Sequence, residues 1–226
     1  MLSLRPKRKK VQSEGTAEYA QPDTAPLTHE KVVAMLEGEG RGKALDVGSG
    51  QGAMAESLKE LGYEVYACDL ENTLRVDGVS WARWDLNSDQ VPYEPGTFDC
   101  VTCIEVIEHI ENPHRLLRSI GSILKEGGTL ILTTPNILHI QSRIQFLLFG
   151  SFIVFSPGDD EHINPLPLWE IERILRITGF EIEVVTNNRY TKLGYFLSLA
   201  LYPILRPRIR PLLGGASLIL KARLRK

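Results

Sequence analysis

Apolar and polar residues follow two periods along the chain, one typical of buried strands and the other of amphipathic helices. Short apolar runs predict strands at 43–48, 63–70, 79–86, 98–106, 129–136 and 181–187. Helical spacing predicts helices at 28–37, 53–62, 112–126 and 166–180, with Gly127 and Gly128 beyond the end of the third. Because strands and helices alternate, we expect a doubly wound, mostly parallel α/β sheet with helices on both faces. Ligands of such sheets bind at the carboxyl ends of the strands.

Length and composition indicate one well-buried domain, since the chain has 226 residues, 43% hydrophobic and 24% charged. We expect residues 1–26, which are basic and then polar without a signal-peptide core, to be a disordered tail, and 27–226 to form the domain. Three cysteines are too few for a secreted disulfide framework and favour a cytoplasmic setting. Cys100 and Cys103 form a C-x-x-C pair, but a strand directs them to opposite faces, which disfavours a shared metal or redox role.

The first predicted strand ends in the sequence LDVGSGQG, residues 45–52. Glycines at 48, 50 and 52 allow the backbone to turn sharply and to approach a ligand closely. Their spacing is G-x-G-x-G, whereas the dinucleotide fingerprint is G-x-G-x-x-G, which disfavours an NAD-dependent enzyme. The loop by itself is also compatible with a βαβ domain in which the glycines only shape a turn.

With its neighbouring motifs, this loop resembles motif I of the class I S-adenosylmethionine-dependent methyltransferases. The resemblance covers residues 40–186 and includes acidic residues at the ends of the second and third strands and the segment LKEGGTLILTTPN. It implies a Rossmann-like, seven-stranded sheet whose last, antiparallel strand is ASLILKARLR, residues 216–225. It also implies S-adenosylmethionine as cofactor, with the methionine moiety near Asp46, the ribose on Asp69 and the adenine beside Asp85. The full predicted cofactor set is Asp46, Gly48, Ser49, Gly50, Gly52, Asp69, Leu70, Asp85 and Leu86.

Two carboxylates and an imidazole follow the fourth strand in the sequence EVIEH, residues 105–109. Ionisable groups near a core are costly unless they are paired or bind a metal. If the chain makes a helical turn here, Glu105, Glu108 and His109 lie on one side, because residues three and four apart are neighbours. In the family the fourth strand ends beside the donor methyl group, so we expect these three residues to be catalytic.

Three roles remain open for this group. His109 can be a general base that takes the proton of an attacking hydroxyl. Alternatively, Glu105, Glu108, His109 and the downstream His162 bind a divalent cation such as Mg²⁺, Mn²⁺ or Fe²⁺. The E-x-x-E-H stretch resembles the metal sites of small-RNA 3′-terminal 2′-O-methyltransferases and of the metal-assisted O-methyltransferases of ubiquinone biosynthesis. In the third role the histidine only caps the next helix.

Two apolar segments, at about 137–163 and 190–214, are expected as insertions on the substrate side of the sheet. The longest uncharged stretch of the second has 13 residues, fewer than the roughly 20 that a membrane-spanning helix needs. From residue 184 onward there are nine Lys or Arg and no Asp or Glu. Apolar and basic residues together favour contact with an anionic membrane surface. The alternative is that both segments pack together as a lid or a dimer interface.

The combined features predict an enzyme that methylates a hydroxyl group of a small-molecule or lipid-linked acceptor. An RNA 2′-O-methyltransferase shares the metal motif, and basic ends can track phosphate, but the chain has no recognisable RNA-binding domain, so nucleic acid is not the expected partner. A non-catalytic scaffold with the same fold needs no cation. We expect the protein in the cytoplasm, peripheral at the inner face of a membrane.

Overall fold

The structure is a computed structural model of the chain, and it describes residues 20, 24–189 and 214–225. Most of the tail predicted for residues 1–26 lies outside the described residues. The second predicted insertion, 190–214, also lies outside them except for its last residue.

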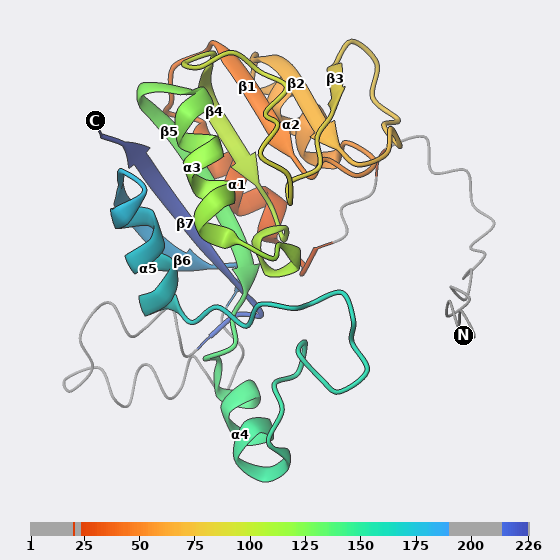
Figure 1. Cartoon of the computed structure of the whole chain (residues 1–226), viewed down its shortest axis with the longest axis vertical. Helices are drawn as coiled ribbons and strands as arrows, with labels where there is room; N and C mark the ends of the chain where they lie inside the picture. The colour runs from red at the N-terminus through yellow and green to blue at the C-terminus, as the bar shows by residue number, and fades with distance from the viewer. Residues whose placement is uncertain (1–19, 21–23, 190–213, 226) are drawn as a thin grey trace.

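One sheet of seven strands forms the centre of the molecule, in the order β3-β2-β1-β4-β5-β7-β6 (Figure 1). The strands are β1 Lys43–Val47, β2 Glu64–Asp69, β3 Ser80–Arg83, β4 Phe98–Cys103, β5 Leu124–Pro135, β6 Phe180–Asn187 and β7 Ser217–Leu224. Neighbouring strands are parallel except where β7 lies antiparallel between β5 and β6. The predicted seven-stranded, mostly parallel sheet with an antiparallel last strand is therefore confirmed.

Helices cover both faces of this sheet. They are α1 Thr28–Leu36, α2 Ala53–Glu60, α3 Pro113–Ile123 and α5 Leu168–Ile177. The structure also describes a helix α4 at Ile140–Phe149 and a 3-10 turn η1 at Ile107–His109. One hydrophobic cluster contains residues of α1 and α2, and the other contains residues of α3 and α5. Cys100 belongs to the first cluster and Cys103 to the second, so the C-x-x-C pair points to opposite faces, as predicted.

Two predicted boundaries are wrong near the site. The helix predicted to reach about residue 126 ends at Ile123, because Leu124 pairs with Phe98 of β4 and begins β5. Gly127, which was predicted to lie beyond the helix, has a φ of 72°, a left-handed conformation that the interior of a helix does not use. The strand predicted to reach residue 106 ends at Cys103, because the chain turns at Glu105, whose φ is 52°. This early turn directs the EVIEH residues toward the end of the sheet.

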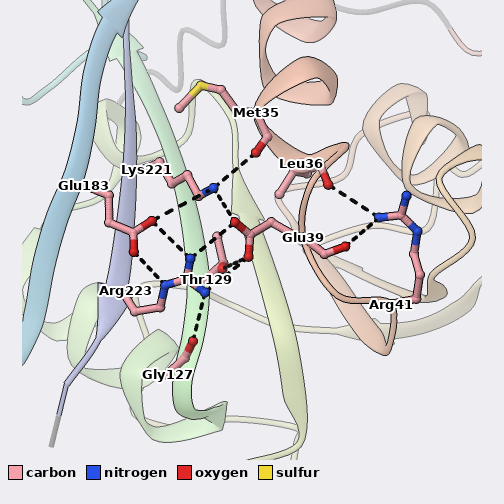
Figure 2. Close-up of polar contacts among 9 residues, drawn as sticks. All are labelled: Met35, Leu36, Glu39, Arg41, Gly127, Thr129, Glu183, Lys221 and Arg223. Carbon is pink, nitrogen blue, oxygen red and sulfur yellow. Dashed lines mark hydrogen bonds and ion pairs between the residues drawn. The ribbon is translucent and has the colours of Figure 1, made fainter.

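A network of charged side chains attaches the end of α1 to the sheet (Figure 2). The carboxylate of Glu39 accepts hydrogen bonds from Lys221 and Arg223 of β7 and from Thr129 of β5. Arg223 also donates to Glu183 of β6, with an Nε–Oε1 distance of 2.8 Å. Burial alone would raise the pKa of Glu39, but the hydrogen bonds and charges of the two basic residues outweigh it and lower that pKa. The network holds α1 in place, and the start of α1 borders the candidate site.

Helix α4 projects away from the layers of the sheet and helices (Figure 1). Its exposed apolar residues are Ile144, Phe146, Leu147, Leu148 and Phe149. Leu147 is 83% exposed and Phe149 is 76% exposed, which is unusual for side chains of this size. Among the helices that the structure describes, none is long and apolar enough to span a membrane.

Candidate active site

The glycine loop after β1 is fixed to β2 by backbone hydrogen bonds. The amides of Gly48 and Ser49 donate to the carbonyl of Cys68 at 2.9 and 3.1 Å, and the amide of Gly50 donates to Asp69 Oδ2 at 2.9 Å. Gly48 has a φ of 69°, and a Cβ added there would lie 2.4 Å from Val106 Cγ2. Glycine is therefore required at this position by both the backbone conformation and the lack of space.

Asp46, at the end of β1, is 2% exposed. Its Oδ1 accepts a hydrogen bond from Thr102 Oγ1 at 2.9 Å. Burial raises the pKa of Asp46 to about 7, although the hydrogen bonds from Thr102 and from the backbone amide of Ala55 oppose this shift. A buried carboxyl group with a raised pKa favours a ligand that brings positive charge to it.

A cavity of about 720 Å³ opens at the carboxyl ends of β1 and β4. The predicted residues that line it are Asp46, Gly48, Ser49, Gly50, Glu105, Glu108, His109 and His162. The two sets of predicted residues, for cofactor and for chemistry, thus meet in one cavity. Three further lining residues, from the start of α1 and the turn before it, were not predicted, namely Thr24, Ala25 and His29.

Five residues of the predicted cofactor set do not line this cavity, namely Gly52, Asp69, Leu70, Asp85 and Leu86. The carboxylate of Asp69 accepts the backbone amides of Gly50 and Leu70, so it braces the glycine loop. Asp85 Oδ1 accepts the amide of Asn87 at 2.9 Å, in the turn after β3. Contacts of these five residues with a cofactor therefore stay predictions.

Glu105 lies at the turn after β4 and is held by one threonine of β5. The backbone amide of Glu105 donates to Thr133 Oγ1 at 2.9 Å, and that hydroxyl donates to Glu105 Oε1 at 2.7 Å. Burial raises the pKa of Glu105, and the hydrogen bond from Thr133 acts in the opposite direction. The carboxylate is thereby fixed at the edge of the cavity.

Glu108 is fully buried within η1. Its Oε2 accepts a hydrogen bond from Thr134 Oγ1 at 3.2 Å, whereas Oε1 has no hydrogen-bond partner among the described residues. Burial, together with the charge of Glu105, raises the pKa of Glu108 to about 8. An unpaired, buried carboxylate oxygen is costly, so this atom is suited to bind a positively charged ligand.

Two imidazole rings lie beside this carboxylate, with their centroids 4.5 Å apart. His109 Nδ1 is 2.8 Å from the backbone carbonyl of Glu161, and His162 Nδ1 is 2.8 Å from Asp159 Oδ2. Because these oxygens only accept hydrogen bonds, each Nδ1 carries a proton. In the neutral rings both Nε2 atoms then keep a lone pair that is free for a proton or a metal.

Glu108, His109 and His162 each offer a ligand atom, and these atoms lie within 4.8 Å of one another. The structure therefore brings together three of the four predicted metal ligands, while Glu105 is not part of the group. One orphaned carboxylate oxygen and two imidazole nitrogens suit a divalent transition metal or Mg²⁺ with open positions. The capping role for His109 is wrong, because Asn112 caps α3 by accepting the amide of Arg115 at 3.0 Å.

Sequence reasoning missed the residues that support the group. Thr133 and Thr134 hold the two glutamates, and Asp159 and the backbone of Glu161 hold the two histidines. Adjacent threonines at the end of an otherwise apolar strand were a usable signal, because hydroxyl groups buried there need polar partners. The contact of His109 with the backbone carbonyl of Glu161 could not be predicted, because every residue has such a carbonyl.

The fold and the cavity define an α/β protein that binds a ligand where a glycine loop opens the carboxyl end of a parallel sheet. A known family, described as a methyltransferase domain, matches residues 17–185 of the chain. Two relatives named "Ubiquinone biosynthesis O-methyltransferase" come from Xanthomonas euvesicatoria pv. vesicatoria and Xanthomonas axonopodis pv. citri. Each is 38% identical over 181 residues, covering 73% of this chain and 73% of its own length. The chain belongs to the class I S-adenosylmethionine-dependent methyltransferases, as its motifs predicted.

Solved structures agree on the fold. A methyltransferase from Archaeoglobus fulgidus aligns with a TM-score of 0.63 at 19% identity, covering 87% of this chain and 94% of its own. Another from Mesorhizobium loti aligns with a TM-score of 0.58 at 18% identity, covering 85% of this chain and 96% of its own. Both are described as S-adenosylmethionine-dependent. The family match and the 38% identical relatives, together with this fold, identify the protein as an enzyme of this class with S-adenosylmethionine as its cofactor.

Proposed function

We propose that the enzyme methylates a hydroxyl oxygen of a small apolar or lipid-linked acceptor, with a divalent cation held by Glu108, His109 and His162. The observation that carries the proposal is the convergence of these three side chains in the same cavity as the glycine loop. The Xanthomonas relatives support oxygen as the acceptor atom and a quinone precursor as the type of acceptor, because their names specify ubiquinone biosynthesis.

On the donor side, the proposal places the methionine part of the cofactor against Asp46 and Ser49. Both line the cavity, and Ser49 Oγ is buried without a hydrogen-bond partner among the described residues. The cofactor carries a positive sulfonium and a positive amino group. Either charge favours the ionised form of Asp46, which burial alone disfavours.

On the acceptor side, Glu108 supplies a carboxylate and each histidine supplies an Nε2 lone pair. A cation bound there would hold two adjacent substrate oxygens and lower the pKa of one of them. The acceptor hydroxyl releases its proton to solvent and its oxygen attacks the methyl carbon in line with the sulfonium, so that an O–C bond forms as the C–S bond breaks and S-adenosylhomocysteine leaves. Positioning supplies much of the rate, because the sulfonium is already a good electrophile. Without a cation, His109 takes the hydroxyl proton at Nε2.

The size and lining of the cavity fit an apolar acceptor of modest size. Its volume of about 720 Å³ is in the range of small-molecule sites. Ile104, Pro135 and Val154 contribute apolar surface to its wall. Val154 follows α4 in the chain, whose exposed apolar side chains favour contact with a membrane surface where a lipid-linked acceptor resides. A lid or a dimer interface is the alternative use of the same side chains.

Transfer from S-adenosylmethionine with a deuterated methyl group tests the acceptor chemistry. The acceptors would be catechol, phenol and aniline derivatives that share one isoprenoid tail, together with a short RNA. We expect labelled product from the catechol and much less from the phenol, because only the catechol has two adjacent oxygens. Labelling of the aniline nitrogen or of the RNA 2′-hydroxyl in preference to the catechol would contradict the proposal. Binding of S-adenosylmethionine without transfer to any acceptor would favour a scaffold.

A further inference from the structure

A short turn before α5 holds one of the two histidines through a single carboxylate. Asp159 Oδ1 accepts the backbone amides of Glu161 and His162 at 3.1 and 3.2 Å. Its Oδ2 lies 2.8 Å from His162 Nδ1. One side chain therefore shapes the turn and also binds the imidazole that the turn carries.

The same turn is attached to the residues across the cavity. The backbone carbonyl of Glu108 accepts the amides of Ile163 and Asn164 at 3.0 and 2.9 Å. His109 Nδ1 donates to the carbonyl of Glu161 at 2.8 Å. These hydrogen bonds join the backbone on either side of His162 to Glu108 and His109, so they set the position of His162 relative to both residues. Asp159 determines the orientation of the His162 ring and which of its nitrogens carries the proton.

A carboxylate can only accept, so it selects the tautomer of the ring. With Asp159 in place, the proton of neutral His162 lies on Nδ1 and the lone pair of Nε2 is free. The other tautomer would place a proton on Nε2 and a lone pair opposite a carboxylate, which is repulsive. Outer carboxylates of this kind fix the ring of a metal-binding histidine and raise its basicity.

We propose that Asp159 is a positioning residue, which holds the Nε2 lone pair of His162 available and thereby sets the affinity of the Glu108–His109–His162 group for a divalent cation. This inference rests on the cation of the proposed function. Asp159 itself touches neither substrate nor cofactor in this account, and it acts through His162. Nothing in the sequence motif requires an aspartate three residues before the histidine.

Asp159→Asn is the informative substitution. The amide oxygen of asparagine can still accept the two backbone amides, so the turn is retained. Its NH₂ group can then face the ring and donate to Nδ1, which moves the imidazole proton to Nε2 and removes the lone pair. The loss of the correct tautomer by the same substitution is the known consequence in serine proteases. Asp160→Asn is the matched control, because Asp160 is the next residue, carries the same charge and is exposed.

Two measurements on the full chain, saturated with S-adenosylmethionine, test the inference. Nitrogen-15 NMR of the imidazoles reports the tautomer of His162, and titration with Mn²⁺ reports the cation affinity. We expect Asp159→Asn to move the His162 proton to Nε2 and to weaken Mn²⁺ binding by about 10- to 100-fold. Asp160→Asn should match the wild type in both measurements.

The outcomes separate this inference from the proposed function. If Asp159→Asn leaves the tautomer and the Mn²⁺ affinity equal to those of Asp160→Asn, the positioning role is overturned. If the wild type binds no Mn²⁺ at all, the cation site of the proposed function is refuted, and with it the role of Asp159 in setting the affinity of that site. Unchanged binding of S-adenosylmethionine by all three proteins shows that the variants remain folded.

Discussion

Replacing Asp46 with asparagine should stabilise the cofactor-free enzyme, and by an amount that depends on pH. Asp46 is 2% exposed and its pKa is raised from 3.8 to about 7 by burial. A raised carboxyl pKa means that folding favours the protonated form. The contribution to stability is fully present below about pH 4 and is lost as the pH rises through about 7.

The magnitude follows from the size of this change. One pKa unit corresponds to about 1.4 kcal/mol, so ionised Asp46 destabilises the folded enzyme by about 4 kcal/mol once the pH exceeds 7. Asparagine does not titrate, and its oxygen can still accept the hydrogen bond from Thr102 Oγ1. The difference in unfolding free energy between Asp46→Asn and wild type should therefore increase by about 3 kcal/mol from pH 5 to pH 8.

Urea unfolding of both proteins, without cofactor and at several pH values, measures this difference. Other titrating groups are present in both proteins and cancel in the subtraction. Asp160→Asn, at an exposed position, is the control and should reproduce the wild-type pH profile. A difference between Asp46→Asn and wild type that stays constant from pH 5 to pH 8 would refute the burial argument. The same variant should bind S-adenosylmethionine more weakly, as expected where a destabilising group serves a ligand.

Three further predictions concern the glycine loop and α4. Gly48→Ala should lower the free energy of unfolding more than Gly50→Ala does. Both glycines have a positive φ, so each alanine costs about 1 kcal/mol of backbone strain, but only the Cβ at position 48 collides with Val106. Equal losses of the two variants in urea unfolding would contradict this. Gly50→Ala should instead weaken cofactor binding in calorimetry, because its Cβ would enter open space at the cavity. A protein with Leu147→Glu and Phe149→Glu in α4 should no longer float with anionic vesicles, because its exposed apolar side chains are lost. The control Trp169→Glu, at an exposed position of α5, should float like the wild type. Equal flotation of the two variant proteins would argue for a lid or a dimer interface.

Much of the fold followed from periodicity, because each strand and helix has its own spacing of apolar residues. The glycine loop could also be predicted from the sequence, since Gly48 has a positive φ and no space for a Cβ, which other residues cannot accommodate. The end of α3 could not be predicted, because the spacing in LKE, residues 124–126, is compatible with a helix and only the pairing of Leu124 with Phe98 decides for a strand. Helical spacing is a local property, whereas strand pairing depends on a distant part of the chain.

Part of the candidate site could likewise be predicted from the sequence, and part of it could not. Glu108, His109 and His162 were predicted as a group, and the structure places their ligand atoms together. Glu105 was assigned to the same group, and its part in it stays a prediction; its carboxylate accepts a hydrogen bond from Thr133, a contact between two strand ends that the sequence does not reveal. Asp159 was also missed, because its importance depends on the ring that it faces and not on a motif.

Methyl transfer to an isoprenoid-tailed catechol, with and without a chelator, tests the central claim most directly. After dialysis against EDTA the enzyme should bind S-adenosylmethionine but transfer no methyl group, and Mg²⁺, Mn²⁺ or Fe²⁺ should restore transfer. Glu108→Ala should behave like the EDTA-treated enzyme and should not be restored by these cations, because it removes a ligand of the group. Full activity in EDTA would contradict the claim and would leave His109 as the base that takes the proton.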